Sequence, residues 1–114
     1  MSIDVELWTR EDGELAPLLP HRDAWESFDG EFQFDGDGWL LSVSSPERAD
    51  PTDVPAELEA LVGGLAYRID LTVEPSGAPP EAWAFLQQVM ASMGARLSGA
   101  GLDPGTGAPR SWAE

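Results

Sequence analysis

The clearest pattern in the chain is an alternation of apolar and polar residues along 67–74. A period of two places successive side chains on opposite faces, so this stretch predicts a strand with one face on a core and one in water. Pro75, Gly77 and the Pro79-Pro80 pair end it, because proline has no N–H for a strand ladder. The core side carries Tyr67, Ile69, Leu71 and Val73, and the wet side carries Arg68, Asp70, Thr72 and Glu74.

The spacing of apolar residues then becomes helical and predicts one main helix at about 79–97. Proline is tolerated in a first helical turn, and Glu81 suits the positive end of the helix dipole. Gly99 and Gly101 fit the end of the helix. The stripe that we expect to be buried consists of Ala82, Phe85, Leu86, Val89, Met90, Met93 and Leu97.

The N-terminal half contains shorter elements. Residues 3–8 alternate and predict a first strand. Residues 25–45 predict a hairpin around the turn sequence Asp35-Gly36-Asp37-Gly38, with Gly36 at positive φ in a two-residue loop. That register pairs Phe34 with Trp39 and Phe32 with Leu41. A short helix at about 54–62, with Asp53 as its N-cap, is expected to bury Leu58, Leu61 and Val62.

Together these elements predict an α+β two-layer sandwich, in which a mostly antiparallel sheet of four or five strands has the main helix on one face. We expect a single domain at 1–107 and a flexible tail at 108–114, from which Trp112 either frays or docks. Whether 98–103 forms a last strand is left open, since it has few β-branched residues. The predicted inner face of the sheet consists of Ile3, Val5, Leu7, Phe32, Phe34, Trp39, Leu41, Ile69, Leu71 and Val73.

Residues 63–107 run from GLAYRIDLTVEP through the main helix to GLDPGTG. This segment resembles the C-terminal half of small uncharacterised bacterial proteins of ferredoxin-like build, whose last strand also leads into a D-P-x-T-G turn. Some of these proteins are described as immunity proteins of toxin systems. The resemblance therefore implies a ferredoxin-like build and an immunity role, and it transfers no functional residue.

Charge changes this picture more than any motif. The chain has 21 acidic residues against six basic ones, for a net charge of −15, and 16 of the acids lie in residues 1–60. Such asymmetry predicts a negative face on one part of the fold. Nucleic acid and anionic membrane surfaces are disfavoured as partners, because both need clustered Lys and Arg. No apolar run approaches the roughly 18 residues of a membrane span.

Candidate catalytic and metal-binding residues are few. His21 is the only histidine and lies in a stretch flanked by proline, which favours a surface histidine over a catalytic one. An EF-hand loop starting at Asp35 would need glycine where Leu40 stands and glutamate where Pro46 stands. The chain has no cysteine for a disulfide or a thiolate metal site. We therefore predict no catalytic residue, no metal and no cofactor.

The remaining candidate is a surface on which large apolar groups stand among carboxylates. If Ile3, Val5 and Leu7 face the main helix, Trp8 and Leu40 lie on the other face, where they could anchor a protein partner. Alternatively, these two side chains pack on each other or under the loop at 11–24. The predicted partner-binding residues are Asp4, Glu6, Trp8, Asp29, Glu31, Asp35, Asp37 and Leu40.

We therefore expect a non-enzymatic acidic binding module of immunity or inhibitor type that neutralises a basic partner protein. Two alternatives are a small carboxylate- or metal-dependent hydrolase and a structural domain whose acidic surface is only solvated. The N-terminus lacks the basic-then-apolar layout of a signal peptide, so a cytoplasmic location is expected. Partner identity and oligomeric state are open.

Overall fold

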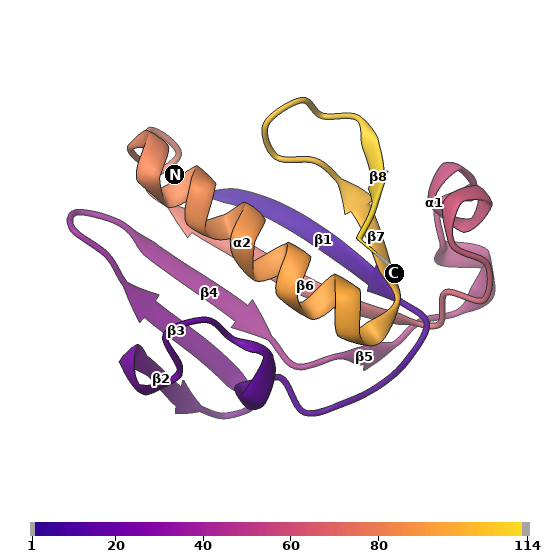
Figure 1. The fold of residues 1–114 in the computed structure, drawn as a ribbon, viewed down its shortest axis with the longest axis horizontal. Coiled ribbons are helices and arrows are strands. Elements are labelled where there is room, and N and C mark those ends of the chain that lie inside the picture. The colour runs from indigo at the N-terminus through magenta and orange to yellow at the C-terminus, as the bar shows by residue number, and fades with distance from the viewer. Residues whose placement is uncertain (1, 113–114) are drawn as a thin grey trace.

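The computed structural model describes residues 2–112, apart from the side chains of Arg22 and Phe28, and folds them into an α+β arrangement (Figure 1). The helix α2 crosses one face of a single twisted sheet, and the short helix α1 stands at one end of it. The strands are β1 (Ile3–Thr9), β2 (Trp25–Phe28), β3 (Glu31–Asp35), β4 (Leu40–Ser44), β5 (Glu47–Arg48), β6 (Tyr67–Glu74), β7 (Gly99–Leu102) and β8 (Pro109–Ser111). The helices are α1 (Ala56–Leu61) and α2 (Pro80–Leu97), with 3-10 turns at η1 (Ala16–Leu18), η2 (Arg22–Ala24) and η3 (Pro51–Asp53).

The strand order is β2-β3-β4-β6-β1-β7-β8, and β5 pairs with the start of β6. Every pair is antiparallel, and β1 and β6 pair over the whole length of β1, from Ile3 opposite Val73 to Thr9 opposite Tyr67. Because β7 is also antiparallel to β1, strands β6 and β7 run parallel on either side of it. α2 therefore connects two parallel strands between which the N-terminal strand is inserted.

The core lies between α2 and the inner face of the sheet, as the two periodicities predict. Leu7, Leu41 and Leu71 are fully buried on the sheet side, and Leu86 and Met90 are fully buried on the helix side. Phe85 of α2 lies at the centre of a group of rings. Its ring centroid is 4.4 Å from that of Phe34 and 5.9 Å from those of His21, Trp25 and Trp39. The predicted buried stripe of the helix is confirmed.

Eight strands in the described residues replace the predicted four or five. One addition, β2, reaches β3 through Asp29 and Gly30, whose φ values of 50° and 77° are those of a two-residue type I′ hairpin turn. The segment left open at 98–103 contains β7, which inserts beside β1. Glycine is needed there, because a Cβ on Gly101 would lie 2.7 Å from the carbonyl oxygen of Glu6.

The C-terminal segment that the sequence predicts to be a flexible tail contains a strand in its described part. β8 pairs with β7, and Trp112 is buried against Gly94 of α2, where a Cβ would lie 2.6 Å from that of Trp112. Burial of the Trp112 side chain against α2 holds the C-terminal segment on the fold. Residues 113 and 114 lie outside the described residues.

Two further predictions about burial and capping are wrong. Leu58 and Val62 are buried, but Leu61 is 47% exposed, because α1 presents a narrower face than predicted. Asp53 does not cap α1, which begins after Pro55; instead Asp50 accepts a hydrogen bond from the Thr52 N–H at the start of η3. Ile3 lies on the helix side of the sheet, as predicted, although it is 38% exposed at the sheet end.

The hairpin between β3 and β4 forms, but its register is shifted by two residues. Phe34 lies opposite Leu41, and Phe32 lies opposite Val43. A shift of two keeps every side chain on its predicted face. The loop is longer because Trp39 turns inward and is buried with its indole against Gly36. Gly38, with φ of 81°, adopts the positive φ that the sequence placed at Gly36.

Gly36→Ala tests this packing. A Cβ at Gly36 would lie 2.0 Å from Cε2 of Trp39, so we expect a loss of about 1–3 kcal/mol in the free energy of unfolding. In a Trp39→Leu background the loss should shrink, since the indole that blocks the Cβ is gone. Denaturant titration of the four proteins in the cycle measures the difference. Equal losses in both backgrounds would show that the indole does not restrict this position.

Candidate acidic binding face

The sheet has an outer face, opposite α2, that is built from the wet side of each strand. The register places Gln33, Ser42, Thr72 and Asp4 in one row across the four central strands. In the next row, Glu31 lies opposite Ser44 and Asp70 lies opposite Glu6. Ser44 Oγ joins the two pairs by accepting a hydrogen bond from the Asp70 N–H. A row of Asp35, Leu40 and Glu74 lies at one end, and a row of Glu47, Arg68 and Trp8 lies at the other.

We use the term outer face for the acids of these rows together with Ser42, Ser44, Thr72, Leu40 and Arg68. Its carboxylates come from four different strands, whereas Arg68 is its only described basic residue. Small hydroxyl side chains, those of Ser42, Ser44 and Thr72, occupy its centre. The outer-face acids are Asp4, Glu6, Glu31, Asp35, Glu47, Asp70 and Glu74.

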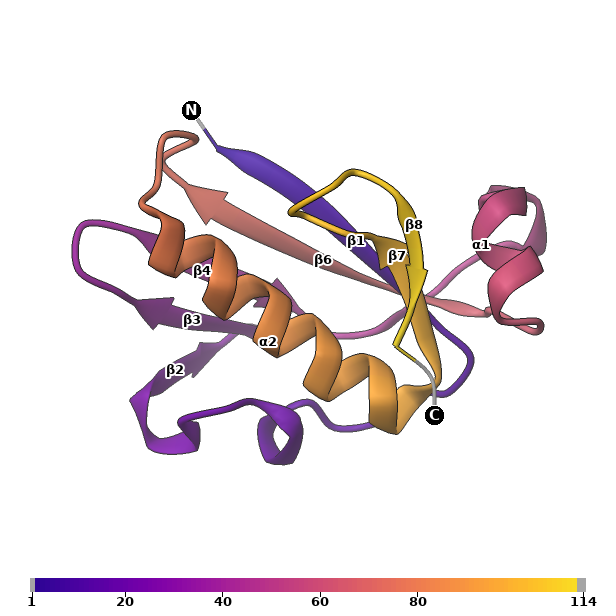
Figure 2. The same ribbon diagram turned by 45° about the horizontal axis from the view of Figure 1, so that its top comes forward.

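A groove of about 760 Å³ opens where α1 and the β7–β8 loop stand on either side of the β1–β6 end of the outer face. We call it the outer groove. The acidic residues that line it are Asp4, Glu6, Glu57, Asp70 and Asp103, and Leu102 contributes an exposed apolar side chain. The two arms that border it, α1 and the β7–β8 loop, are separate in both views of the fold (Figure 2).

Arg68 is already paired within the outer groove. Its Nε lies 3.2 Å from Oδ1 of Asp70 and its NH1 lies 3.9 Å from Oε2 of Glu6, while its guanidinium carbon is 5.9 Å from the ring centroid of Trp8. Both ion pairs are exposed, so each contributes little to stability. The outer groove therefore contains more carboxylates than Arg68 can neutralise.

Trp8 does not play the predicted role of an exposed anchor. It lies on the outer side of β1 as expected, but it is only 3% exposed. Leu58, Val62 and Leu65, from α1 and the segment after it, pack over the indole together with Ala100. The loop at 11–24 lies instead on the side of α2, where Leu15 and Leu19 join the main core and Ser92 Oγ donates to the Leu18 carbonyl.

Five of the other predicted partner-binding residues come together. Asp4, Glu6, Glu31, Asp35 and Leu40 share the outer face, and Leu40 is half-buried between Asp35 and Glu74.

Asp29 and Asp37 lie in the exposed turns at opposite ends of β3, at the margin of the face. The prediction missed Asp70 and Glu74, although the alternation along 67–74 already assigns both to the wet side. No alternation of apolar and polar residues in the sequence indicates that Glu47 or Glu57 belongs to this site.

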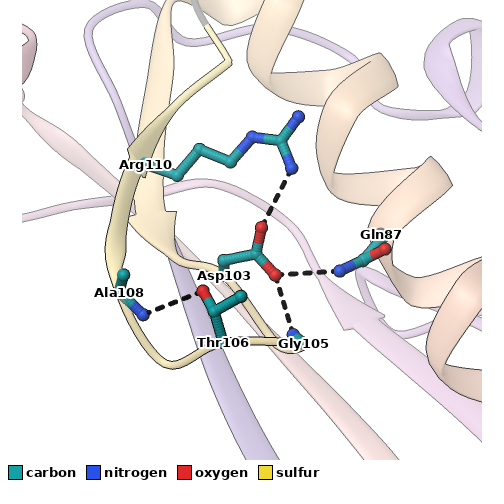
Figure 3. A network of polar contacts seen from close by, with 6 residues as sticks. All are labelled: Gln87, Asp103, Gly105, Thr106, Ala108 and Arg110. Carbon is teal, nitrogen blue, oxygen red and sulfur yellow. Dashed lines mark hydrogen bonds and ion pairs between the residues drawn. The ribbon is translucent and has the colours of Figure 1, made fainter.

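The wall formed by the β7–β8 loop is held by Asp103 (Figure 3). Its Oδ1 accepts hydrogen bonds from Gln87 Nε2 at 2.8 Å and from the Gly105 N–H at 2.7 Å, and its Oδ2 accepts one from Arg110 NH1 at 2.9 Å. The Gly105 N–H, followed by Arg110 and then Gln87, holds the pKa of Asp103 below its ordinary value. The GLDPGTG segment is thus a turn that is tied to α2.

Asp103→Asn tests whether this carboxylate holds the loop through its charge. Because its folded pKa is lowered, ionised Asp103 stabilises the fold above the unfolded pKa, and the stabilisation is lost as pH falls through the folded pKa. We expect the free energy of unfolding of the variant to be about 1–3 kcal/mol lower than that of the wild type at neutral pH. This difference should narrow below about pH 3.9. Urea titration at several pH values measures it, with exposed Asp53→Asn as control. A gap that does not change with pH would contradict this role.

Other candidates for chemistry are placed as follows. His21, with φ of 55°, lies beside the core and stacks on Phe85. In residues 2–112, no group of three or more His, Cys, Asp or Glu side chains could hold a metal ion. Neither described helix is long and apolar enough to cross a membrane.

No model of a known protein family, no curated protein and no solved structure matches this chain. The resemblance of residues 63–107 to proteins of ferredoxin-like build, some of them immunity proteins, therefore stays a prediction. Function is inferred from the geometry and charge of the outer face.

Proposed function

We propose that this protein is a non-enzymatic binding module of immunity or inhibitor type, which neutralises a basic partner protein by covering it with the outer face. One observation carries the proposal: an open sheet face on which carboxylates from four strands surround small hydroxyl side chains. Most of the hydrophobic core lies on the opposite side of the sheet, against α2, so the outer face can be this polar without cost to packing.

Charge favours a basic protein as the occupant. Exposed carboxylates on a broad surface produce a negative potential that steers positively charged partners and accelerates their association. The single guanidinium of the face is held by Glu6 and Asp70, so it does not offset the acids beyond the groove. Proteins that bind nucleic acid carry clustered Lys and Arg for phosphate contacts, and these clusters complement such a face. A nuclease toxin or another nucleic-acid-binding protein fits this description.

The groove end of the face supplies a different kind of contact. Leu102 lines the outer groove and is 44% exposed at its rim. Apolar side chains at the edge of a charged surface are available to a partner and contribute affinity, whereas the charges contribute speed and selectivity. Leu102, which lines the outer groove, therefore replaces buried Trp8 as the apolar contact of the proposed interface.

The experiment begins with capture of proteins from the source cells on the immobilised chain at low salt, followed by identification and purification of any basic protein that raised salt releases. Association of the purified partner is then measured with two double variants of equal net charge. Glu31→Lys with Glu74→Lys reverses charge on the outer face. Glu11→Lys with Glu14→Lys reverses it on the exposed 11–14 segment, which leads to the side of α2.

We expect the outer-face variant to associate about tenfold more slowly than wild type at low salt, and the 11–14 variant to change much less. Equal slowing by both variants would mean that total charge, rather than this face, attracts the partner. Failure to retain any basic protein would leave the acidic face as a solvated surface and would end the proposal.

A further inference from the structure

Part of β1 has an unpaired edge. On the side away from β6, β1 pairs with β7 only at residues 7–9. Beyond Leu102, the chain turns away as the β7–β8 loop, which Asp103 and Gln87 hold beside α2 (Figures 2 and 3). The Glu6 carbonyl oxygen still lies against Gly101 of β7, but no described strand pairs with this side of residues 3–5. In an antiparallel strand, alternate residues direct their N–H and C=O groups to such an edge.

Two grooves meet at this edge, one on each face of the sheet. The outer groove lies on one side, and a second groove of about 710 Å³, the helix-side groove, lies on the other. Val5 and Pro104 line both grooves, so they are continuous past the strand edge. Ile3, Ala78 and Trp83 give the helix-side groove an apolar lining, in contrast to the carboxylates of the outer groove.

The edge lacks several of the features that usually protect edge strands, and its two charged residues, Asp4 and Glu6, would repel an acidic strand but attract a basic one. Proteins block free edges with proline, lysine, bulges or very short strands. The outermost strand β8 has three residues and begins with Pro109, and β2 at the opposite end has four. Residues 3–6 belong to a strand of seven residues, contain no proline or lysine, and include Ile3, which is 38% exposed.

We propose that this edge binds an extended segment of the basic partner by β-strand addition, and that the segment alternates Lys or Arg with apolar residues. This inference rests on the proposed function and names the part of the partner that is recognised. Successive side chains of an added strand point to opposite faces. One set would enter the outer groove, where Asp4, Glu6 and Asp70 favour cations, and the other would enter the apolar helix-side groove. The strand edge supplies backbone hydrogen bonds, and the two grooves supply specificity.

Synthetic peptides test the inference without the natural partner. The probe is an eight-residue peptide that alternates lysine and valine, and its control has the same composition with four lysines followed by four valines. Two further peptides carry N-methyl groups on alternate backbone amides, one on the lysines and one on the valines. Affinity is measured by titration into the full isotope-labelled protein, and contacts with residues 3–6 are measured by NMR.

We expect the alternating peptide to bind about tenfold more tightly than the block control, with cross-strand contacts to residues 3–6. One methylated peptide should lose about tenfold in affinity and the other should bind like the parent, because only one set of amides faces the edge. Ala84→Arg, which fills the helix-side groove, should weaken binding about tenfold, whereas Gln88→Arg, exposed but outside the lining, should not.

Equal binding of the alternating and block peptides, with shifts confined to the outer face, would overturn strand addition and leave the proposed function standing. Absence of binding by either peptide would also overturn it. Equal effects of both N-methylation patterns would show that the backbone is not recognised. The proposed function fails separately, when low-salt capture retains no basic protein.

Discussion

Trp8→Ala is expected to lower the free energy of unfolding by about 3–5 kcal/mol. The reason is burial: the indole is 3% exposed and lies beneath Leu58, Val62 and Leu65. Removing it leaves a cavity between β1 and the segment that contains α1. We also expect faster amide hydrogen exchange in α1 than in α2, because the cavity lies next to α1. Denaturant titration and hydrogen exchange measure the two effects.

Trp8→Phe is the matched control, since it keeps a ring in the same site and should lose much less stability. A loss below about 0.5 kcal/mol for Trp8→Ala would be the value of a surface position. That result would mean that α1 does not cover the indole, and the sequence-based interpretation of Trp8 as an exposed anchor would then be correct.

Leu86→Ala should cost about 2–5 kcal/mol, because Leu86 is fully buried where α2 meets the centre of the sheet. Gln88→Ala, at an exposed position of the same helix, should stay within about 0.5 kcal/mol of wild type. Both values come from urea titration. Similar small losses in the two variants would show that a different side of α2 faces the sheet.

The parts of the fold that could be predicted are those in which local periodicity and burial agree. Along 67–74 the alternation assigns Ile69, Leu71 and Val73 to the core, and all three are fully buried. The predicted helix at about 79–97 matches α2 within one residue. Neither result depends on contacts with distant segments, because an amphipathic strand or helix has one apolar face wherever it packs.

The parts that could not be predicted depend on contacts between distant segments. The hairpin register shifts because Trp39 turns inward onto Gly36, a choice that the turn sequence does not encode. β8 forms because Trp112 fits the space above Gly94, 18 positions earlier in the chain. Trp8 lies on the predicted side of β1, but only the three-dimensional packing of Leu58 and Val62 shows that it is covered.

The candidate site was predicted in part for the same reason. The alternation along residues 3–8 places Asp4 and Glu6 on the outer face, but only the sheet order shows that Asp70 and Glu74 of β6 share it. Asp29 was assigned to the site although it belongs to a turn with φ of 50°, where its conformation serves the β2–β3 hairpin. Strand order is a property of the whole chain and is not readable from any one segment.

The central claim is that the outer face contacts a basic protein. The most direct measurement is the change in amide chemical shifts when the isotope-labelled chain is titrated with its purified basic partner. We predict the largest changes in β1, β4 and β6, at residues 4–6, 40–44 and 68–74, and little change at the exposed α2 positions Gln88 and Arg96. The largest changes on α2 or the 11–14 segment, with the outer face unaffected, would contradict the claim.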